Sequence, residues 1–379
     1  MTALGRASAL ALGVLMIGSL AACSQDPDEA AAAGTEVSVH ATDTACELGA
    51  EEIEAGSATF AIHNEGSKVT EVYVLRSDES IVAERENIGP GTSADLTVAL
   101  RAGDYVVRCK PGMAGEGIAA PLAVTGGPAS AAPAADARLE QAVTDYRAYV
   151  LAQVDDSIKL TEALVAAVKA GNVAEAKRLY APSRVGWESI EPVAESFGDI
   201  DPRVDLREAD LAAGEEWTGW HRIEKGLFVS GSTDGLASYG DQLLADLREL
   251  RQRVPDAEIT PTSMANGAKE LLDEVATGKV TGEEEAFSHT DLVDFEANVV
   301  GAEKVLVLLH EVVTDNEPEL AATLDKEFGV VLGLLDKHRD GDGFVSYDTV
   351  GDDDRRVLSD AVNALAEPLS NLAAAVTPR

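Results

Sequence analysis

The sequence has 379 residues, more than the roughly 100–200 of a typical domain, so we expect two domains. Its formal net charge is −37, from 30 Lys and Arg against 67 Asp and Glu, which argues against nucleic acid as a partner because nucleic acid needs a basic surface. The excess favours cations as partners, and solubility or adaptation to salt explains it equally well. Aromatic residues make up only 4% of the chain, a composition that suits helices packed through small side chains.

The first 22 residues indicate an export signal. Arg6 precedes an apolar run from Ala7 to Ser19, which is shorter than the ~20 residues of a typical membrane-spanning helix. The stretch "LAAC" resembles a bacterial lipobox, and this resemblance implies cleavage before Cys23 and lipidation of its thiol; plain secretion after Ala22 is the alternative. No later segment is apolar enough to span a membrane, so we expect an extracytoplasmic protein that is lipid-anchored to the cell membrane.

Residues 23–34 are polar and rich in Ala, and we interpret them as a tether. Short runs of alternating apolar and polar residues follow, such as "SATFAIHN", "ADLTVAL" and "GDYVVRC", with turn residues between them. Evenly spaced short strands indicate a β-sandwich over residues 35–125. Because loops at one end of a sandwich cluster, we expect Cys46 and Cys109 to lie close together. An exported chain allows a disulfide between them, and a thiolate metal site is the alternative.

A linker rich in Pro, Gly and Ala at 126–137 separates the sandwich from a region of helical periodicity. Apolar residues then recur every three or four positions, which predicts a helical bundle over 138–379. We expect few contacts across the linker, so that 138–379 folds alone. The predicted helices are 138–170, 173–181, 184–197, 205–229, 235–253, 262–276, 289–313, 317–338 and 354–376.

A His-x-x-Glu motif lies in the predicted helix at 205–229. His221 and Glu224 share one helical face, where an imidazole and a carboxylate can hold a metal ion or form an ordinary polar pair. The segment upstream is rich in carboxylates, among them Glu188, Asp201 and Asp205. Carboxylate oxygens suit hard cations, ferric iron included, so one His with two or three carboxylates fits an iron site.

Other motifs indicate less. His289 and Asp291 are explained by the capping of a helix. The segment 336–348 resembles part of an EF-hand loop but has Thr349 where calcium needs an acidic ligand, so we interpret it as a turn that ends a helix. The sequence contains no His-Glu-x-x-His, Gly-x-Ser-x-Gly or P-loop motif, so these common sequence motifs of hydrolases are missing.

Several long segments resemble the EfeO-type iron-uptake lipoproteins. They are "YAPSRVGWESIEPVAESFGDIDPRVDLR", "EWTGWHRIEKGLF" and "GEEEAFSHTDLVDFEANVVGAEK" in the helical region, and "AERENIGPGTSADLTVAL" with the pair Cys46 and Cys109 in the sandwich. The resemblance covers nearly all of the mature chain. It implies a multidomain protein, β plus all-α, with an N-terminal cupredoxin-like β-sandwich and a C-terminal imelysin-like helical bundle.

The resemblance also implies site residues and partners. The metal, expected to be iron with zinc as a substitute, would be bound by His221 and Glu224, with Glu188, Asp201 and Asp205 as further ligands. The implied partners are a ferric-iron permease of the membrane and a haem peroxidase of the dye-decolorising type.

For the sandwich, the resemblance implies copper or iron bound by Cys46, Glu71 and Cys109. The sequence departs from the family at "EVYVL", where the family often has Glu-Trp-Glu and this chain has Tyr73. The loss of one acidic position weakens this second site, especially any copper-dependent oxidation of ferrous iron.

We therefore expect a non-enzymatic, membrane-anchored iron-binding component that passes its metal to a permease. One alternative is a metallopeptidase that uses His221 and Glu224 as zinc ligands. Another is a structural or adhesion lipoprotein in which the motif has no metal. A metal titration separates iron binding from the adhesion role, and a peptide-cleavage screen tests the peptidase.

Overall fold

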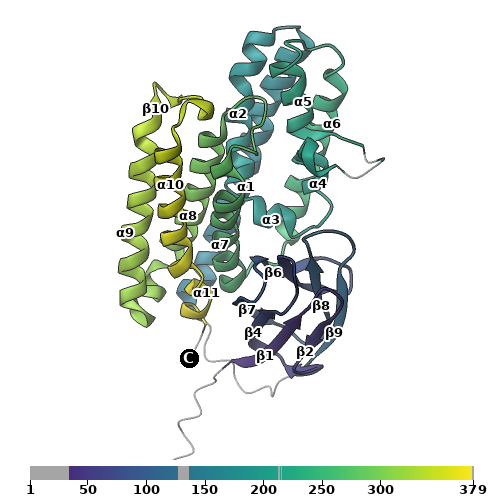
Figure 1. The fold of residues 1–379 in the computed structure, drawn as a ribbon, viewed down its shortest axis with the longest axis vertical. Helices are drawn as coiled ribbons and strands as arrows, with labels where there is room; N and C mark the ends of the chain where they lie inside the picture. Colours follow the sequence, from purple (N-terminus) through teal and green to yellow (C-terminus); the bar gives the residue numbers. More distant parts are fainter. Residues whose placement is uncertain (1–33, 127–135, 212–213, 215, 378–379) are drawn as a thin grey trace, which may run out of the picture. The chain divides into compact units, whose positions relative to one another are not determined.

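The computed structural model describes residues 34–126, 136–211, 214 and 216–377. Gly34–Pro378 form one compact unit, which contains both the strands and the helices (Figure 1). The predicted signal peptide, the lipidation site at Cys23 and most of the linker lie outside the described residues. Among the helices in the described part of the chain, none combines the length and the apolar character that crossing a membrane requires.

The N-terminal part is a sandwich of two β-sheets, as predicted. One sheet has the strand order β2–β1–β4–β7 and the other β3–β9–β8–β5–β6. β1 pairs in parallel with β4, and β3 with β9, while the other pairs in these two sheets are antiparallel. Alternate side chains such as Phe60, Val74 and Leu96 fill the core between the sheets. The strands are β1 (Thr35–Ala41), β2 (Cys46–Leu48), β3 (Glu52–Glu54), β4 (Gly56–Asn64), β5 (Thr70–Arg76), β6 (Ile81–Ile88), β7 (Ser93–Leu100), β8 (Gly103–Pro111) and β9 (Ile118–Thr125).

A disulfide joins the two sheets of the sandwich. Cys46 in β2 and Cys109 in β8 have Cα atoms 5.6 Å apart and are bonded through their sulfurs, so the prediction that they lie close together is confirmed. Because the bond consumes both thiols, neither cysteine can act as a thiolate ligand. The structure thus contradicts the predicted metal site of Cys46, Glu71 and Cys109. Glu71 instead forms an ion pair with Lys110, with 2.9 Å between Oε1 and Nζ.

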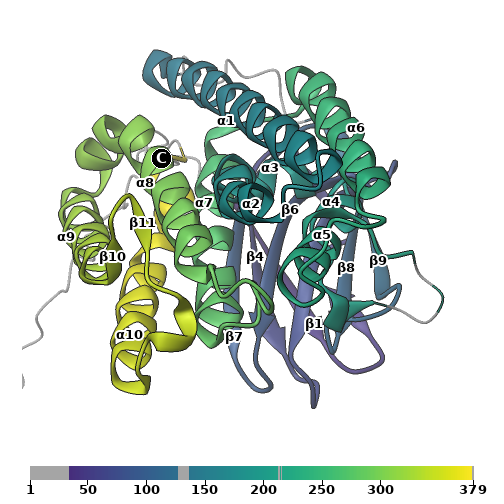
Figure 2. The ribbon, with the colours of Figure 1, turned by 90° about the horizontal axis from the view of Figure 1, so that it is seen from above.

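Helices make up most of the chain after the linker, as the periodicity predicts. α1 packs against α2, α6 and α8, and α7 packs against α8 and α10 (Figure 2). Asp136 caps α1 by accepting a hydrogen bond from the backbone N–H of Arg138. The helices are α1 (Ala137–Lys169), α2 (Val173–Glu188), α3 (Glu191–Glu195), α4 (Asp201–Val204), α5 (Gly219–Phe228), α6 (Ala237–Arg253), α7 (Pro261–Thr277), α8 (Asp291–Asn316), α9 (Pro318–Leu335), α10 (Asp352–Leu369) and α11 (Leu372–Ala375).

The predicted helix at 205–229 is wrong in its first half. α4 ends at Val204, and α5 begins only at Gly219, which has a φ of +79°. A Cβ atom on this residue would lie 2.1 Å from the carbonyl oxygen of Val204, so only glycine fits there. Upstream, the predicted break near Pro182 does not occur, because α2 continues through this proline to Glu188. The predicted turn at 336–348 contains a short hairpin of two strands with two residues each, β10 (Arg339–Asp340) and β11 (Gly343–Phe344).

The sandwich packs directly on the helices through α7. β6 and β7 both contact this helix, and the Asn266 side chain donates a hydrogen bond to the carbonyl of Thr97 at 3.0 Å. Arg85 Nη1 lies 3.4 Å from Asp273 Oδ2, and Arg76 pairs with Glu258. The expectation that few contacts cross between the two regions is therefore wrong. The edge strands of both sheets, β6 and β7, lie beside α7.

Candidate metal site

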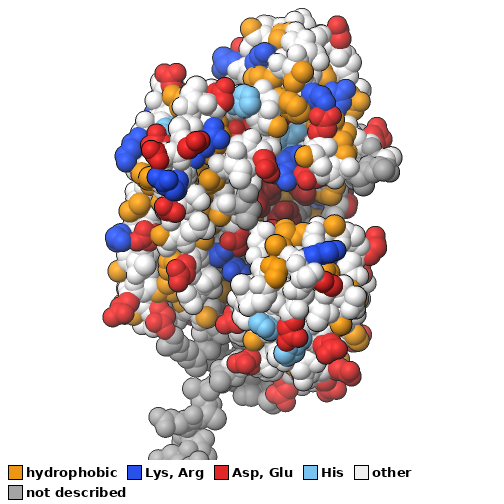
Figure 3. All heavy atoms as spheres, viewed as in Figure 1, with side chains coloured by type: hydrophobic (Ala, Val, Ile, Leu, Met, Phe, Trp, Pro, Cys, Tyr) orange, Lys and Arg blue, Asp and Glu red, His pale blue; other side chains and the backbone are white. Residues whose placement is uncertain are grey.

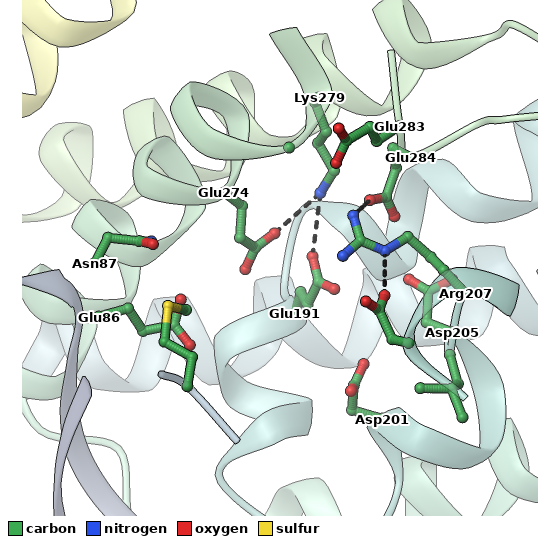
Figure 4. Close-up of a pocket in the computed structure, with 14 residues that line it drawn as sticks. Glu86, Asn87, Glu191, Asp201, Asp205, Arg207, Glu274, Lys279, Glu283 and Glu284 are labelled. Atoms are coloured by element: carbon green, nitrogen blue, oxygen red, sulfur yellow. Dashed lines mark hydrogen bonds and ion pairs between the residues drawn. The ribbon is translucent and has the colours of Figure 1, made fainter. Parts of the chain in front are cut away.

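An acidic cavity of about 400 Å³ lies beside α3, α4 and the end of α7. Figure 4 shows carboxylates from several elements pointing into the same space, and Figure 3 shows red side chains gathered in a hollow of the surface. Arg207 and Lys279 supply the positive charge among its lining residues. Such an excess of negative charge in a concave site attracts cations. The acidic lining residues are Glu86, Glu191, Asp201, Asp205, Asp210, Glu274, Glu283 and Glu284.

His221 lies behind this acidic wall and is only 2% exposed. Its Nε2 atom is 3.3 Å from Asp205 Oδ1 and 3.5 Å from Glu284 Oε1. Nε2 forms ion-pair contacts with both carboxylates, but it makes no hydrogen bond of acceptable geometry with any described residue. Two ligand atoms that bind one ion at roughly 2.1 Å, about 100° apart, are ~3.2 Å from each other. The spacing of these three atoms therefore fits a shared metal ion.

Glu224 lies on the other side of the imidazole. Its Oε2 atom is 3.2 Å from His221 Nδ1, and its Oε1 accepts hydrogen bonds from the backbone N–H groups of Phe287 at 2.9 Å and Ser288 at 2.7 Å. The carboxylate is fully buried and does not line the cavity. A carboxylate that binds the second nitrogen of a histidine fixes the ring and its tautomer. This geometry favours Glu224 as the group that turns Nε2 towards Asp205 and Glu284.

Asp205 is held as an ionised ligand by the residues around it. Arg184 pairs with its Oδ1, and Trp187 Nε1 donates to Oδ2 at 2.7 Å. Burial by itself would raise the pKa of Asp205, but the charges of Arg184 and His221 outweigh it and hold this pKa well below its usual value. Burial is also outweighed at Glu284, where Lys279 and His221 lower the pKa to about 2. Both carboxylates are therefore charged at neutral pH.

The same carboxylates keep a proton on His221. Burial and the charge of Arg184 lower the pKa of His221, but Asp205, Glu224 and Glu284 together outweigh them and raise this pKa well above its usual value. A metal needs the lone pair of a neutral imidazole. Metal binding at Nε2 therefore displaces a proton from the ring.

A second group of possible ligand atoms adjoins the first. Glu191, Asp201 and Asp205 each offer a carboxylate oxygen, and these atoms lie within 4.8 Å of one another. Burial, and then the charge of Asp205, raise the pKa of Asp201 to about 7. Asp205 belongs to both groups. An ion bound at Asp205 would therefore have Glu284 and His221 on one side of this residue and Glu191 and Asp201 on the other.

The structure separates the predicted ligands. His221 lies with Asp205 in one group of possible ligand atoms and with Glu224 in another, which Glu285 completes, and Asp201 lies in the adjoining group. Glu188 is not brought to His221: it is fully buried between Arg184 and Lys279, whose Nζ is 2.8 Å from its Oε2. Glu284, which was not among the predicted ligands, lies near His221 instead of Glu188 and belongs to the loop before α8. The run of three Glu residues at 283–285 could have indicated a ligand in this loop, but nothing in the local sequence shows which of the three lies near His221.

Two family models match the chain. The model described as imelysin matches residues 142–372, and the model described as a cupredoxin-like domain matches residues 12–119. These matches agree with the sandwich and the helical region seen in the structure.

Similar proteins are also found among characterised and solved ones. The iron uptake system component EfeO of Escherichia coli K12 is 40% identical over 342 residues, covering 89% of this chain and 90% of its own. The EfeO of Shigella flexneri matches to the same extent. A structure from Parabacteroides distasonis, described as an iron-regulated protein A precursor, has a TM-score of 0.51 at 16% identity and covers 65% of this chain and 97% of its own, which supports the fold alone. The chain therefore belongs to the EfeO family, with a cupredoxin-like domain before an imelysin domain.

Proposed function

We propose that this chain is the iron-binding component of an iron uptake system, and that Asp205, His221 and Glu284 hold the iron. The observation that supports this most is the His221 Nε2 atom, buried, free of hydrogen bonds from the described residues, and 3.3 and 3.5 Å from two carboxylates. The name of the E. coli relative, an iron uptake system component, agrees with it. Carboxylate-rich sites with few imidazoles suit iron among the transition metals.

The surroundings of Glu224 favour binding over catalysis. A zinc peptidase that uses His221 and Glu224 as zinc ligands needs a free oxygen on the Glu224 carboxylate to bind the metal. Here both oxygens of Glu224 are occupied, by two backbone N–H groups and by His221 Nδ1. A protein that delivers metal must also release it, and ligands that can be protonated allow that release. We therefore propose a carrier that passes iron on, and the word peptidase is only part of the name of the imelysin family.

The proposal extends to anchoring and partners. The lipobox-like "LAAC" supports lipidation at Cys23, which would hold the protein at the outer face of the cytoplasmic membrane. There it would hand iron to a ferric-iron permease and work beside a dye-decolorising haem peroxidase. The test of this part is metabolic labelling with a fatty acid, since Cys23→Ala should abolish labelling while purified iron affinity stays the same.

The metal site is tested by substitution of the two motif residues. We expect His221→Ala to weaken ferric iron binding at least tenfold, or by about 1.4 kcal/mol, in isothermal titration calorimetry. Glu224→Ala should weaken binding about 10- to 100-fold, because the imidazole loses the group that orients it. His310→Ala, a histidine on the surface of α8, is the matched control. Unchanged ferric affinity in both motif variants would refute the site.

The identity of the metal needs its own measurement. An imidazole with carboxylates also accepts zinc and copper, and zinc can substitute for iron in the proposed site. We expect elemental analysis of protein purified without added metal to find iron above zinc and copper. A protein that contains zinc and takes up no iron from ferric citrate would contradict the uptake role.

A further inference from the structure

Three further carboxylates meet where the sandwich faces the helices. Glu84 comes from β6, Glu195 is the last residue of α3, and Glu270 lies in the middle of α7. Each offers one oxygen atom, and the three atoms lie within 4.8 Å of one another. Glu84 is only 7% exposed, so its carboxylate is directed inward, at the other two. These residues are separate from Asp205, His221 and Glu284.

The three carboxylates lack partners. Within the described residues, none of them forms a hydrogen bond or an ion pair. The cations whose charges act on this group are engaged elsewhere, since Arg85 and Lys269 pair with Asp273, and Lys110 pairs with Glu71. Glu84 is the most deeply buried of the three, whereas Glu195 and Glu270 are half-buried. A carboxylate buried without a partner, as Glu84 is, is costly, and it demands a proton or a cation.

A small cavity adjoins two of these three side chains. A small cavity of about 50 Å³ is lined by Glu84 and Glu270, together with apolar side chains such as Ile81 and Met264. This is enough room for one ion with a water molecule. Burial, followed by the charges of neighbouring carboxylates, raises the pKa of Glu270 to about 8, which agrees with a site that awaits positive charge.

We propose that Glu84, Glu195 and Glu270 bind a second cation, of the hard, oxygen-preferring class to which Mn²⁺ and ferric iron belong. The set has only carboxylate oxygens, without nitrogen or sulfur, and this composition favours hard cations over the softer metals. The ion joins β6 to α3 and α7, so it couples the sandwich to the helical region. The proposal does not depend on iron at His221.

The second site is linked to the first through shared carboxylates. Glu195 also groups with Glu191 and Glu274, and Glu191 in turn groups with Asp201 and Asp205. Asp205 is the residue that faces His221. Every step in this series joins oxygen atoms within 4.8 Å, so the two sites are the ends of one continuous run of carboxylates.

The test is a count of bound ions. Mature protein, freed of metal, is titrated with Mn²⁺ at pH 7.5, and unbound Mn²⁺ is measured by electron paramagnetic resonance. We expect two ions per chain in the wild type and one in both Glu84→Gln and Glu270→Gln. His221→Ala should also bind one, and the double variant Glu84→Gln with His221→Ala none. Glu47→Gln, on the surface of β2, is the matched control and should keep two.

Thermal unfolding checks that the variants fold and separates the outcomes. Without metal, Glu84→Gln should melt at or above the wild-type temperature, because it removes an unpartnered buried charge, and it should lose part of the rise in melting temperature that Mn²⁺ causes. A wild type that binds one ion, lost only in His221→Ala, overturns the second site and leaves the proposed function standing. If His221→Ala leaves the affinity for ferric iron unchanged while Glu84→Gln still lowers the number of bound Mn²⁺ ions by one, the proposed function fails and the second site stands.

Discussion

The sandwich and the helical region differ in what they bury. The core of the sandwich is apolar and closed by a disulfide, and its buried carboxylates, Glu71 in β5 and Glu84 in β6, are both on the five-stranded sheet. The helical region buries three cations, Arg184, Lys269 and Lys279, within a larger set of carboxylates. Arg184 has no exposed surface and pairs with Glu188, Asp205 and Glu285, the last at 2.8 Å.

This difference indicates which region was built for stability and which for binding. Buried ion pairs add little net stability, because the loss of hydration offsets the attraction between the charges. A network of this size is therefore expected where charge has another use, and here it surrounds His221. The disulfide has a simpler role, since it stabilises a small domain that has few buried residues.

The largest expected effect comes from removing the central cation of the helical region. We expect Arg184→Met to lower the free energy of unfolding by about 3–5 kcal/mol, because it leaves several buried carboxylates without a counter-charge. Urea denaturation measures the change. Arg178→Met, in an exposed pair with Glu175 on the same helix, should cost less than about 1 kcal/mol. Equal effects of the two substitutions would show that the buried network has no special role in stability.

A smaller effect is expected from opening the sandwich. The Cys46–Cys109 disulfide closes a loop of 63 residues in sequence separation. Chain-entropy arguments give about 4 kcal/mol for such a loop, and measured losses are typically about 2–5 kcal/mol. Because the sandwich packs on α7, the double variant Cys46→Ala with Cys109→Ala should unfold at lower urea concentration, and iron affinity at His221 should remain within about twofold. A large loss of iron affinity would show that the two regions are not separable in this way.

The smallest expected effect is the pH dependence of the metal-free protein. Burial, and then the charge of Glu71, raise the pKa of Glu86 to about 7, while burial raises the pKa of Glu270 to about 8. Above pH 4.5 the unfolded state loses these protons and the folded state keeps them. Stability must therefore fall as pH rises from about 4.5 through about 8.

We expect the melting temperature, measured with a chelator present, to be about 5 °C lower at pH 8 than at pH 6. The double variant Glu86→Gln with Glu270→Gln should show a smaller decrease. A melting temperature that rises over this interval would contradict the raised pKa values and, with them, the contrast between the acidic interface and the apolar core of the sandwich.

The sequence predicted the two-domain plan and much of the secondary structure. Alternation at 57–64, 94–100 and 103–109 corresponds to β4, β7 and β8, because the sheet faces of a sandwich impose a period of two. Long amphipathic stretches likewise predicted α1, α6 and α7 within one or two residues. The helix expected at 205–229 failed, because the close approach of Gly219 to Val204 is a tertiary contact that local periodicity does not report.

What the sequence by itself determined is the chemistry available: two cysteines in the sandwich, a His-x-x-Glu motif and an excess of carboxylates. Only the tertiary structure decided which of these groups meet. It joined Cys46 to Cys109, turned Glu224 towards Nδ1, placed Glu284 at Nε2, and buried Glu188 against Arg184 and Lys279. The reason is physical: a metal site is a set of distances of a few ångströms among residues 16 to 79 positions apart along the chain, as Asp205, His221 and Glu284 are. Spacing in the sequence determines such distances only within one helix or one strand.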